Sequence, residues 1–206
     1  MKLLSETEKT SIRELIQSVE SRTSGEIVTV IAANSDDYLF IPTLWAALIS
    51  LLIPGVVMLF NVWVEYTWVY LAQVLGFFLL ASLFRIPTIK MRLIPQQVKR
   101  QRASRLAREQ FFQQGLHNTR ERTGVLIFVS VAEHYAEIIA DKGINDVVSQ
   151  HAWQDILSHF VSQIKQGQHA DGFVSCIDQC GEILHKHFPA LADNNPNELS
   201  NRLIEI

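Results

Sequence analysis

The clearest hydrophobic pattern is a stretch of 46 residues, from 39 to 84, with almost no charge. Its first part, LFIPTLWAALISLLIPGVVMLF (39–60), and its last part, YTWVYLAQVLGFFLLASLF (66–84), contain no charged residue at all. A helix rises about 1.5 Å per residue, so each part can cross a hydrocarbon core of about 30 Å. Apolar residues occupy every angle around both helices, whereas a core helix of a soluble protein keeps a polar stripe. The pattern predicts a two-helix transmembrane hairpin.

The residues next to these two helices fit the same prediction. Trp63, Tyr66, Trp68 and Tyr70 cluster near the short connection, and such rings favour the headgroup layer of a bilayer. The pair Pro54-Gly55 lies inside the first helix and should kink it. Two alternatives stay open: a re-entrant hairpin that does not cross the bilayer, and a buried hairpin in the core of a soluble protein.

Basic residues predict the orientation of the hairpin. Residues 85–108 contain eight Lys and Arg and no Asp or Glu, while the connection 61–65 contains no basic residue. By the positive-inside rule, both termini are expected in the cytoplasm of a bacterial-type inner membrane, with the connection outside. The residues expected to contact anionic lipid headgroups are Arg85, Lys90, Arg92, Lys99, Arg100 and Arg102. This segment lacks the interleaved aromatic residues of a nucleic-acid-binding surface, so no nucleic acid is expected as a partner.

The rest of the chain alternates helical and strand patterns. Apolar residues at helical spacing predict helices over about 5–22, 95–115, 151–166 and 171–188, the first opened by a capping box at Ser5 and Glu8. Runs of β-branched and apolar residues predict strands over 26–32 and 124–131 and a third, antiparallel strand over 135–140. A last helical turn is expected at 199–206.

Helices before and after a buried sheet predict an α/β fold, a three-layer αβα sandwich interrupted by the transmembrane hairpin. The expected organisation begins with a helix and first strand at 1–38 and continues with the hairpin at 39–84. The remainder of the sandwich follows at 85–188, and a loosely ordered tail at 189–206.

Several segments outside the hairpin carry a family resemblance. They are TSGEIVTV (23–30), TGVLIFVS (123–130), YAEIIADKGI (135–144), Trp153 with Ile156, and the segment 167–172 followed by a helix. Together they make residues 4–35 and 101–188 resemble the TPM domain family. The resemblance implies an αβα sandwich that is often tethered to a membrane. Some members are associated with calcium binding, acid phosphatase activity or photosystem repair.

Acidic residues in loops suggest one candidate metal site. Asp36, Asp37, Asp141 and Asp146 follow predicted strands and could gather at one end of the sheet, where a hard cation such as calcium would find carboxylate oxygens. No EF-hand spacing is present, and solvated loop carboxylates explain the same residues. No other cofactor is expected.

A candidate general base and a candidate zinc site each have a simpler structural explanation. His134, next to Glu133, could act as a general base or be a surface turn residue. Cys176 and Cys180, with His185 and His187, could hold zinc, but their spacing matches no zinc finger, and core packing of the cysteines explains it. The sequence contains no P-loop, GxSxG or HExxH motif.

These observations favour a protein without enzymatic activity: a membrane-anchored TPM-domain protein that serves as an interaction or scaffold module at the cytoplasmic face and docks another membrane protein. The alternative is a metal-dependent, calcium-linked enzyme of the acid phosphatase type. The catalytic residues of such an enzyme are unknown from the sequence.

Overall fold

The structure is a computed structural model that describes residues 4–60, 63–190, 198–199 and 203–206. The chain divides into two compact units. Unit 1 combines Met1–Ser35 with Arg102–Ile206, and unit 2 is Asp36–Gln101.

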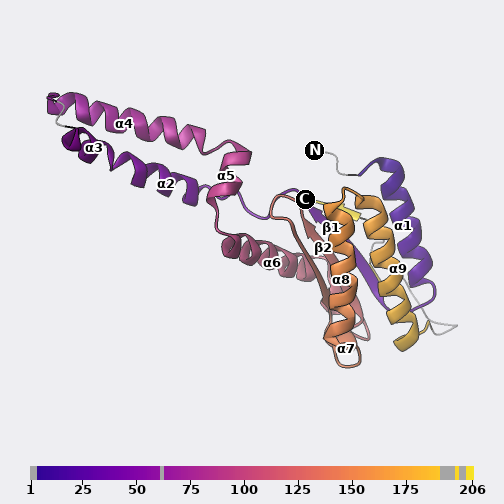
Figure 1. Ribbon diagram of the computed structural model, residues 1–206. Helices are drawn as coiled ribbons and strands as arrows, with labels where there is room; N and C mark the ends of the chain where they lie inside the picture. The colour runs from indigo at the N-terminus through magenta and orange to yellow at the C-terminus, as the bar shows by residue number, and fades with distance from the viewer. Residues whose placement is uncertain (1–3, 61–62, 191–197, 200–202) are drawn as a thin grey trace. The chain divides into compact units, whose positions relative to one another are not determined.

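A four-stranded sheet with the strand order β3-β2-β1-β4 is the centre of unit 1 (Figure 1). Strand β1 (Glu26–Ala32) is parallel to β2 (Gly124–Ser130) and to β4 (Leu203–Glu205). Strand β3 (Tyr135–Ala140) is antiparallel to β2 and forms one outer edge. The three strands expected from the sequence are therefore confirmed, the third with its antiparallel direction.

The register defines two ends of the sheet. Glu26 of β1 pairs with Gly124 of β2 at the first end, called the Glu26 end below. Ala32 pairs with Ser130 at the second, called the Ala32 end. Every residue of β1 and β2 is buried, which explains their nearly unbroken apolar sequences, since a strand covered on both faces has no solvent side.

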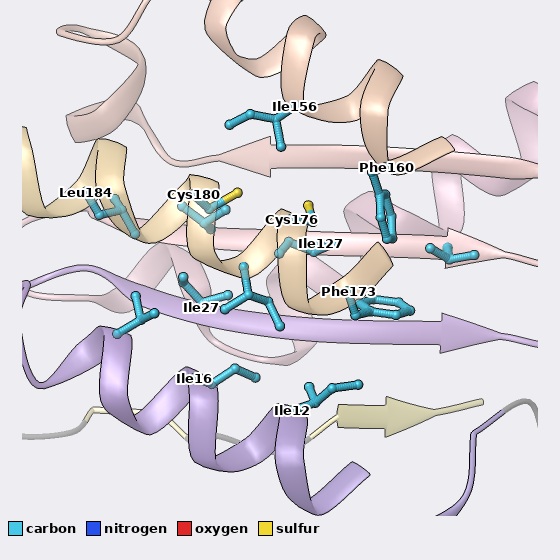
Figure 2. Close-up of a cluster of buried hydrophobic side chains, with 14 of the residues drawn as sticks. Ile12, Ile16, Ile27, Ile127, Ile156, Phe160, Phe173, Cys176, Cys180 and Leu184 are labelled. Carbon is cyan, nitrogen blue, oxygen red and sulfur yellow. The ribbon is translucent and has the colours of Figure 1, made fainter. Parts of the chain in front are cut away.

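Three helices cover one face of the sheet: α1 (Glu6–Glu20), α8 (Gln150–Lys165) and α9 (His169–His187). Figure 2 shows their side chains meeting those of β1 and β2, with Phe160 beside Phe173. The two phenyl rings pack edge to face, with centroids 5.0 Å apart. This cluster is the larger core of unit 1.

The opposite face is covered by helix α6 (Gln96–Gln113). Its residues Ala103, Ala107 and Phe111 are buried against β1 and β2 residues such as Val30 and Phe128. Helices on both faces make the three-layer αβα arrangement that the sequence predicts.

A capping box and two glycines mark helix boundaries close to those expected from the sequence. Ser5 and Glu8 form the expected capping box, with the Ser5 backbone N–H donating to Glu8 Oε2 at 2.6 Å. Gly115 after α6 and Gly167 after α8 adopt left-handed backbone angles, with φ of 76° and 80°, which glycine tolerates without strain.

Two short helical segments connect the larger elements at the Glu26 end: η1 (Leu116–Asn118) before β2, and α7 (Lys142–Asn145) after β3. Gly143 of α7 lies against backbone. A Cβ there would meet the carbonyl oxygen of Glu121 and would lie 2.8 Å from that of Arg122.

The predicted helical turn at 199–206 is wrong. Residues 203–205 form β4, which pairs with β1 from Thr29 to Ile31. Leu203 and Ile204 pack against opposite faces of the sheet, because alternate residues of a strand point to opposite sides. Residues 191–197 and 200–202 of the expected tail lie outside the described residues.

Unit 2 contains the helices of the apolar stretch: α2 (Phe40–Ser50), α3 (Ile53–Leu59) and α4 (Tyr66–Leu83), followed by α5 (Pro87–Leu93). Helices α2 and α3 pack against α4. The break between α2 and α3 confirms the predicted kink, since Pro54 has no N–H to donate to the carbonyl of Ser50.

Candidate functional site

The most extensive functional feature of unit 2 is its apolar surface. Among the described residues, two segments are long and apolar enough to cross a membrane, Phe40–Leu59 and Tyr66–Leu83. No residue of α3 or α4 is buried, and large side chains such as Met58, Leu75 and Phe78 are 62–80% exposed. A helix in the core of a soluble protein would bury such side chains, whereas α3 and α4 expose a largely apolar surface.

Small side chains allow these helices to approach each other closely. The buried residues of α2 are Pro42, Ala46 and Ser50, spaced four apart along one face. A Cβ at Gly76 of α4 would lie only 2.7 Å from Cδ1 of Ile53. Small residues at helix contacts are typical of helices that associate in lipid, where close backbone packing replaces the hydrophobic effect.

The expected membrane-surface residues are distributed unevenly. Arg85, Arg92 and Arg100 are exposed, and Arg102 is exposed at the start of unit 1. Lys90 is half-buried and donates from Nζ to the carbonyl of Asp37 at 3.1 Å. Lys99 is only 9% exposed. Contact of these residues with lipid headgroups stays a prediction.

The four candidate metal ligands belong to different units of the structure. Asp141 and Asp146 flank α7 at the Glu26 end, where Asp141 caps the helix and forms an ion pair with Arg122 at 3.1 Å. Asp36 and Asp37 follow β1 beyond its Ala32 end, and Asp36 Oδ1 accepts the backbone N–H of Tyr38 at 2.9 Å.

No group of three or more His, Cys, Asp or Glu side chains suited to a metal ion occurs in the part of the chain that the structure describes. Calcium binding and the phosphatase alternative therefore stay predictions. The zinc candidate is not assembled either. Cys176 and Cys180 are buried in the core cluster, whereas His187 is exposed and His185 Nδ1 lies 2.8 Å from the carbonyl of Arg22.

A buried pair of carboxyl groups at the Glu26 end was not expected from the sequence. Glu20, at the end of α1, and Glu26, at the start of β1, are 7% and 6% exposed. Burial raises the pKa of Glu20 to about 8, and the adjacent Glu26 adds to this. Burial also raises the pKa of Glu26, while backbone N–H groups of Glu198 and Leu199 oppose that rise.

The carboxyl groups of Glu20 and Glu26 can hydrogen-bond to each other when they share one proton. Glu20 Oε1 accepts the Ile27 N–H at 2.9 Å, and its carboxyl group hydrogen-bonds to Glu26. Glu26 Oε1 accepts the Glu198 N–H at 3.0 Å. A protonated Glu20 can donate to an ionised Glu26, which places a single negative charge where backbone donors stabilise it.

At the Ala32 end, Glu133 organises the turn between β2 and β3. It is 4% exposed, bonds to the hydroxyl of Ser130, and accepts the backbone N–H of Ser35 at 3.0 Å. The neighbouring His134 is exposed and has a left-handed φ of 51°. Glu133 therefore helps to fix the turn, and a general-base role of His134 stays a prediction.

Comparison with known proteins agrees with this architecture. Residues 88–183 match the family model described as the TPM domain. This part of the chain belongs to the TPM domain family. The matched part of the TPM domain includes β2, β3 and α8, while α1 and β1 precede it in the sequence.

A solved structure shows the same fold over nearly the whole length. The NMR structure of BA42 protein from the psychrophilic bacterium Bizionia argentinensis is 24% identical, with a TM-score of 0.62 over 98% of this chain and 95% of that chain. At this level of identity the likeness shows the fold alone. No curated protein matches the chain.

Proposed function

We propose that this TPM-domain protein is anchored in a bacterial-type inner membrane by a hairpin of α2–α3 and α4, and that unit 1 is a cytoplasmic interaction module. The observation that carries the anchoring is the exposure of two uncharged helical segments, Phe40–Leu59 and Tyr66–Leu83. At 1.5 Å per residue these 20 and 18 residues span about 30 and 27 Å, the thickness of a hydrocarbon core.

The ends of the hairpin support the proposed orientation. Trp63 is fully exposed and Tyr66 is 85% exposed beside the connection, which suits aromatic rings at the outer headgroup layer. Arg85 and Arg92 are exposed beyond the other end, where the cytoplasmic leaflet carries anionic lipids. Each such residue near the surface contributes about 1 kcal/mol of attraction.

The outer edge of the sheet supports the interaction role. Strand β3 is the terminal strand on its side, its residues are all half-buried, and a cavity of about 380 Å³ lies beside Glu137, Ile138 and Trp153. An edge strand can pair with an added strand from a partner, while an adjacent cavity receives a side chain. The proposed partner is a segment of another membrane protein.

Cysteine accessibility tests the anchoring and orientation together. The native Cys176 and Cys180 are 0–1% exposed, so they should react little with a maleimide, and labelling should come mainly from an added cysteine. In intact cells, an impermeant maleimide is expected to label a Glu65→Cys variant at once. A Gln17→Cys variant, on the exposed face of α1, is expected to react only after the cells are permeabilised.

Labelling of residue 17 in intact cells, or protection of residue 65, would contradict the orientation. Recovery of the chain in the soluble fraction after carbonate extraction would contradict the anchoring itself. The interaction role is tested by a photoreactive side chain at position 137. It should crosslink to one membrane protein that the same group at the exposed Glu182 does not capture.

A further inference from the structure

Unit 1 contains a cavity at the Ala32 end that none of the functions above uses. Its volume is about 430 Å³, within the roughly 300–1,000 Å³ of small-molecule sites. It lies where the parallel strands β1 and β2 end and where the α8–α9 connection passes. Ligands of open α/β sheets bind outside the carboxyl ends of their strands, which is this position.

The walls of the cavity are apolar. Ile31 and Val129 come from the two strands, Val161 and Ile164 from α8, and Phe173 from α9. Phe173 is buried and packs edge to face against Phe160, so this wall is part of the main core (Figure 2). Such walls suit a hydrocarbon chain, which gains free energy from leaving water.

Besides the hydroxyl groups of Ser130 and Tyr135, three residues with nitrogen-containing side chains line the cavity. Lys165 ends α8, His169 begins α9, and His134 lies in the turn after β2. Lys165 and His134 are exposed, and His169 is half-buried. An ammonium group and two imidazoles can donate hydrogen bonds to an anion.

The acidic residues near this lining already have partners, one of which, for Glu8, is His169 of the lining itself. Glu133 accepts from Ser35, and Glu137 Oε2 accepts from the Tyr135 hydroxyl at 2.9 Å. The pKa of Glu8 is lowered by hydrogen bonds from Ser5 and, to a smaller extent, by His169. No Asp or Glu lines the cavity within the described residues, so the lining favours a negative ligand.

We propose that this cavity binds an amphipathic anion, with an acyl or alkyl chain against the apolar walls and a carboxylate or phosphate group beside Lys165, His134 and His169. The inference concerns unit 1 only and does not rest on the membrane anchoring.

The test uses the full chain in lipid nanodiscs and a decanoate carrying a photoreactive diazirine. Mass spectrometry should locate the label on peptides that contain Val161, Ile164 or Phe173. Decanoate and decyl phosphate are added as competitors, with decanol as the neutral control. Competition by one of the two anions identifies the headgroup, and competition by both indicates a site for either.

Competition by decanol at the same concentration as the anions would overturn the proposal, as would the absence of label from these peptides. A Lys165→Gln variant should weaken competition by decanoate about two- to fivefold, the range for an exposed ion pair. A Lys186→Gln variant, exposed on α9 and outside the lining, should leave it unchanged.

A Val161→Trp variant should fill the cavity and abolish labelling. Its folding is checked by thermal unfolding beside the wild type. The Lys165→Gln result decides the proposal if the larger side chain prevents folding, because Lys165 is exposed and outside the core. Equal affinity for decanoate in Lys165→Gln and the wild type would refute the proposal that Lys165 binds the anionic group.

Discussion

Replacing Glu20 by glutamine should make the protein more stable at neutral pH, although it removes a buried, hydrogen-bonded side chain. Burial raises the pKa of Glu20 from an ordinary 4.5 to about 8. Between these values the folded chain holds a proton that the unfolded chain has released. The wild type therefore carries no destabilisation from Glu20 below about pH 4.5, and its free energy of unfolding falls as the pH rises toward about 8.

The magnitude follows from this linkage. Each pH unit within the window costs about 1.4 kcal/mol, so the wild type should lose about 3 kcal/mol between pH 5 and pH 7 through this group. A glutamine stays neutral at every pH. Its oxygen can still accept the Ile27 N–H, and its amide can donate to Glu26, so both hydrogen bonds of the native pair persist.

The assay is thermal unfolding of the full chain in detergent from pH 5 to pH 8. The melting temperature of Glu20→Gln should rise relative to the wild type as the pH increases, by on the order of 10 °C between pH 5 and pH 7. A Glu14→Gln variant is the matched control, because Glu14 is exposed on the same helix. If the wild-type and Glu20→Gln melting temperatures stay parallel across this range, Glu20 does not bind the proton and the reasoning fails.

Three other substitutions test the packing of unit 1, each by its melting temperature, and a glycine of unit 2 serves as a control for the first. Gly143→Ala should destabilise by about 1–3 kcal/mol because its Cβ meets rigid backbone, while Gly55→Ala, with nothing within 4 Å, should be neutral or stabilising; equal effects would contradict the close approach. Phe160→Ala should cost about 3–5 kcal/mol, since the ring is 1% exposed, and a loss below about 1 kcal/mol would show that the aromatic pair is not a rigid part of the core. Ile204→Asp should cost about 1–3 kcal/mol by placing a carboxylate against the sheet, and an unchanged melting temperature would mean that β4 is not docked in solution.

Elements whose environment is uniform along their length can be predicted from the amino-acid sequence alone. Strand β1 was predicted over 26–32 and is found at Glu26–Ala32, because a strand covered on both faces needs an unbroken apolar run. The same reasoning gave β2 to within one residue. The two uncharged helices and the kink before Pro54 also follow from local composition, which sets what solvent a helix surface can tolerate.

Features that depend on distant residues become visible only in the folded chain. The three residues of β4 carry too short a pattern to distinguish a strand from a helical turn, and their pairing with β1 joins positions about 170 residues apart. The contact between Glu20 and Glu26 could not be predicted from the sequence, since it depends on how α1 packs against the sheet. The cavity at the Ala32 end is formed in the same way, from three strands, a turn and two helices whose spacing no local pattern encodes. Local free energies select the elements, whereas the chemistry between elements is set by which of them pack together.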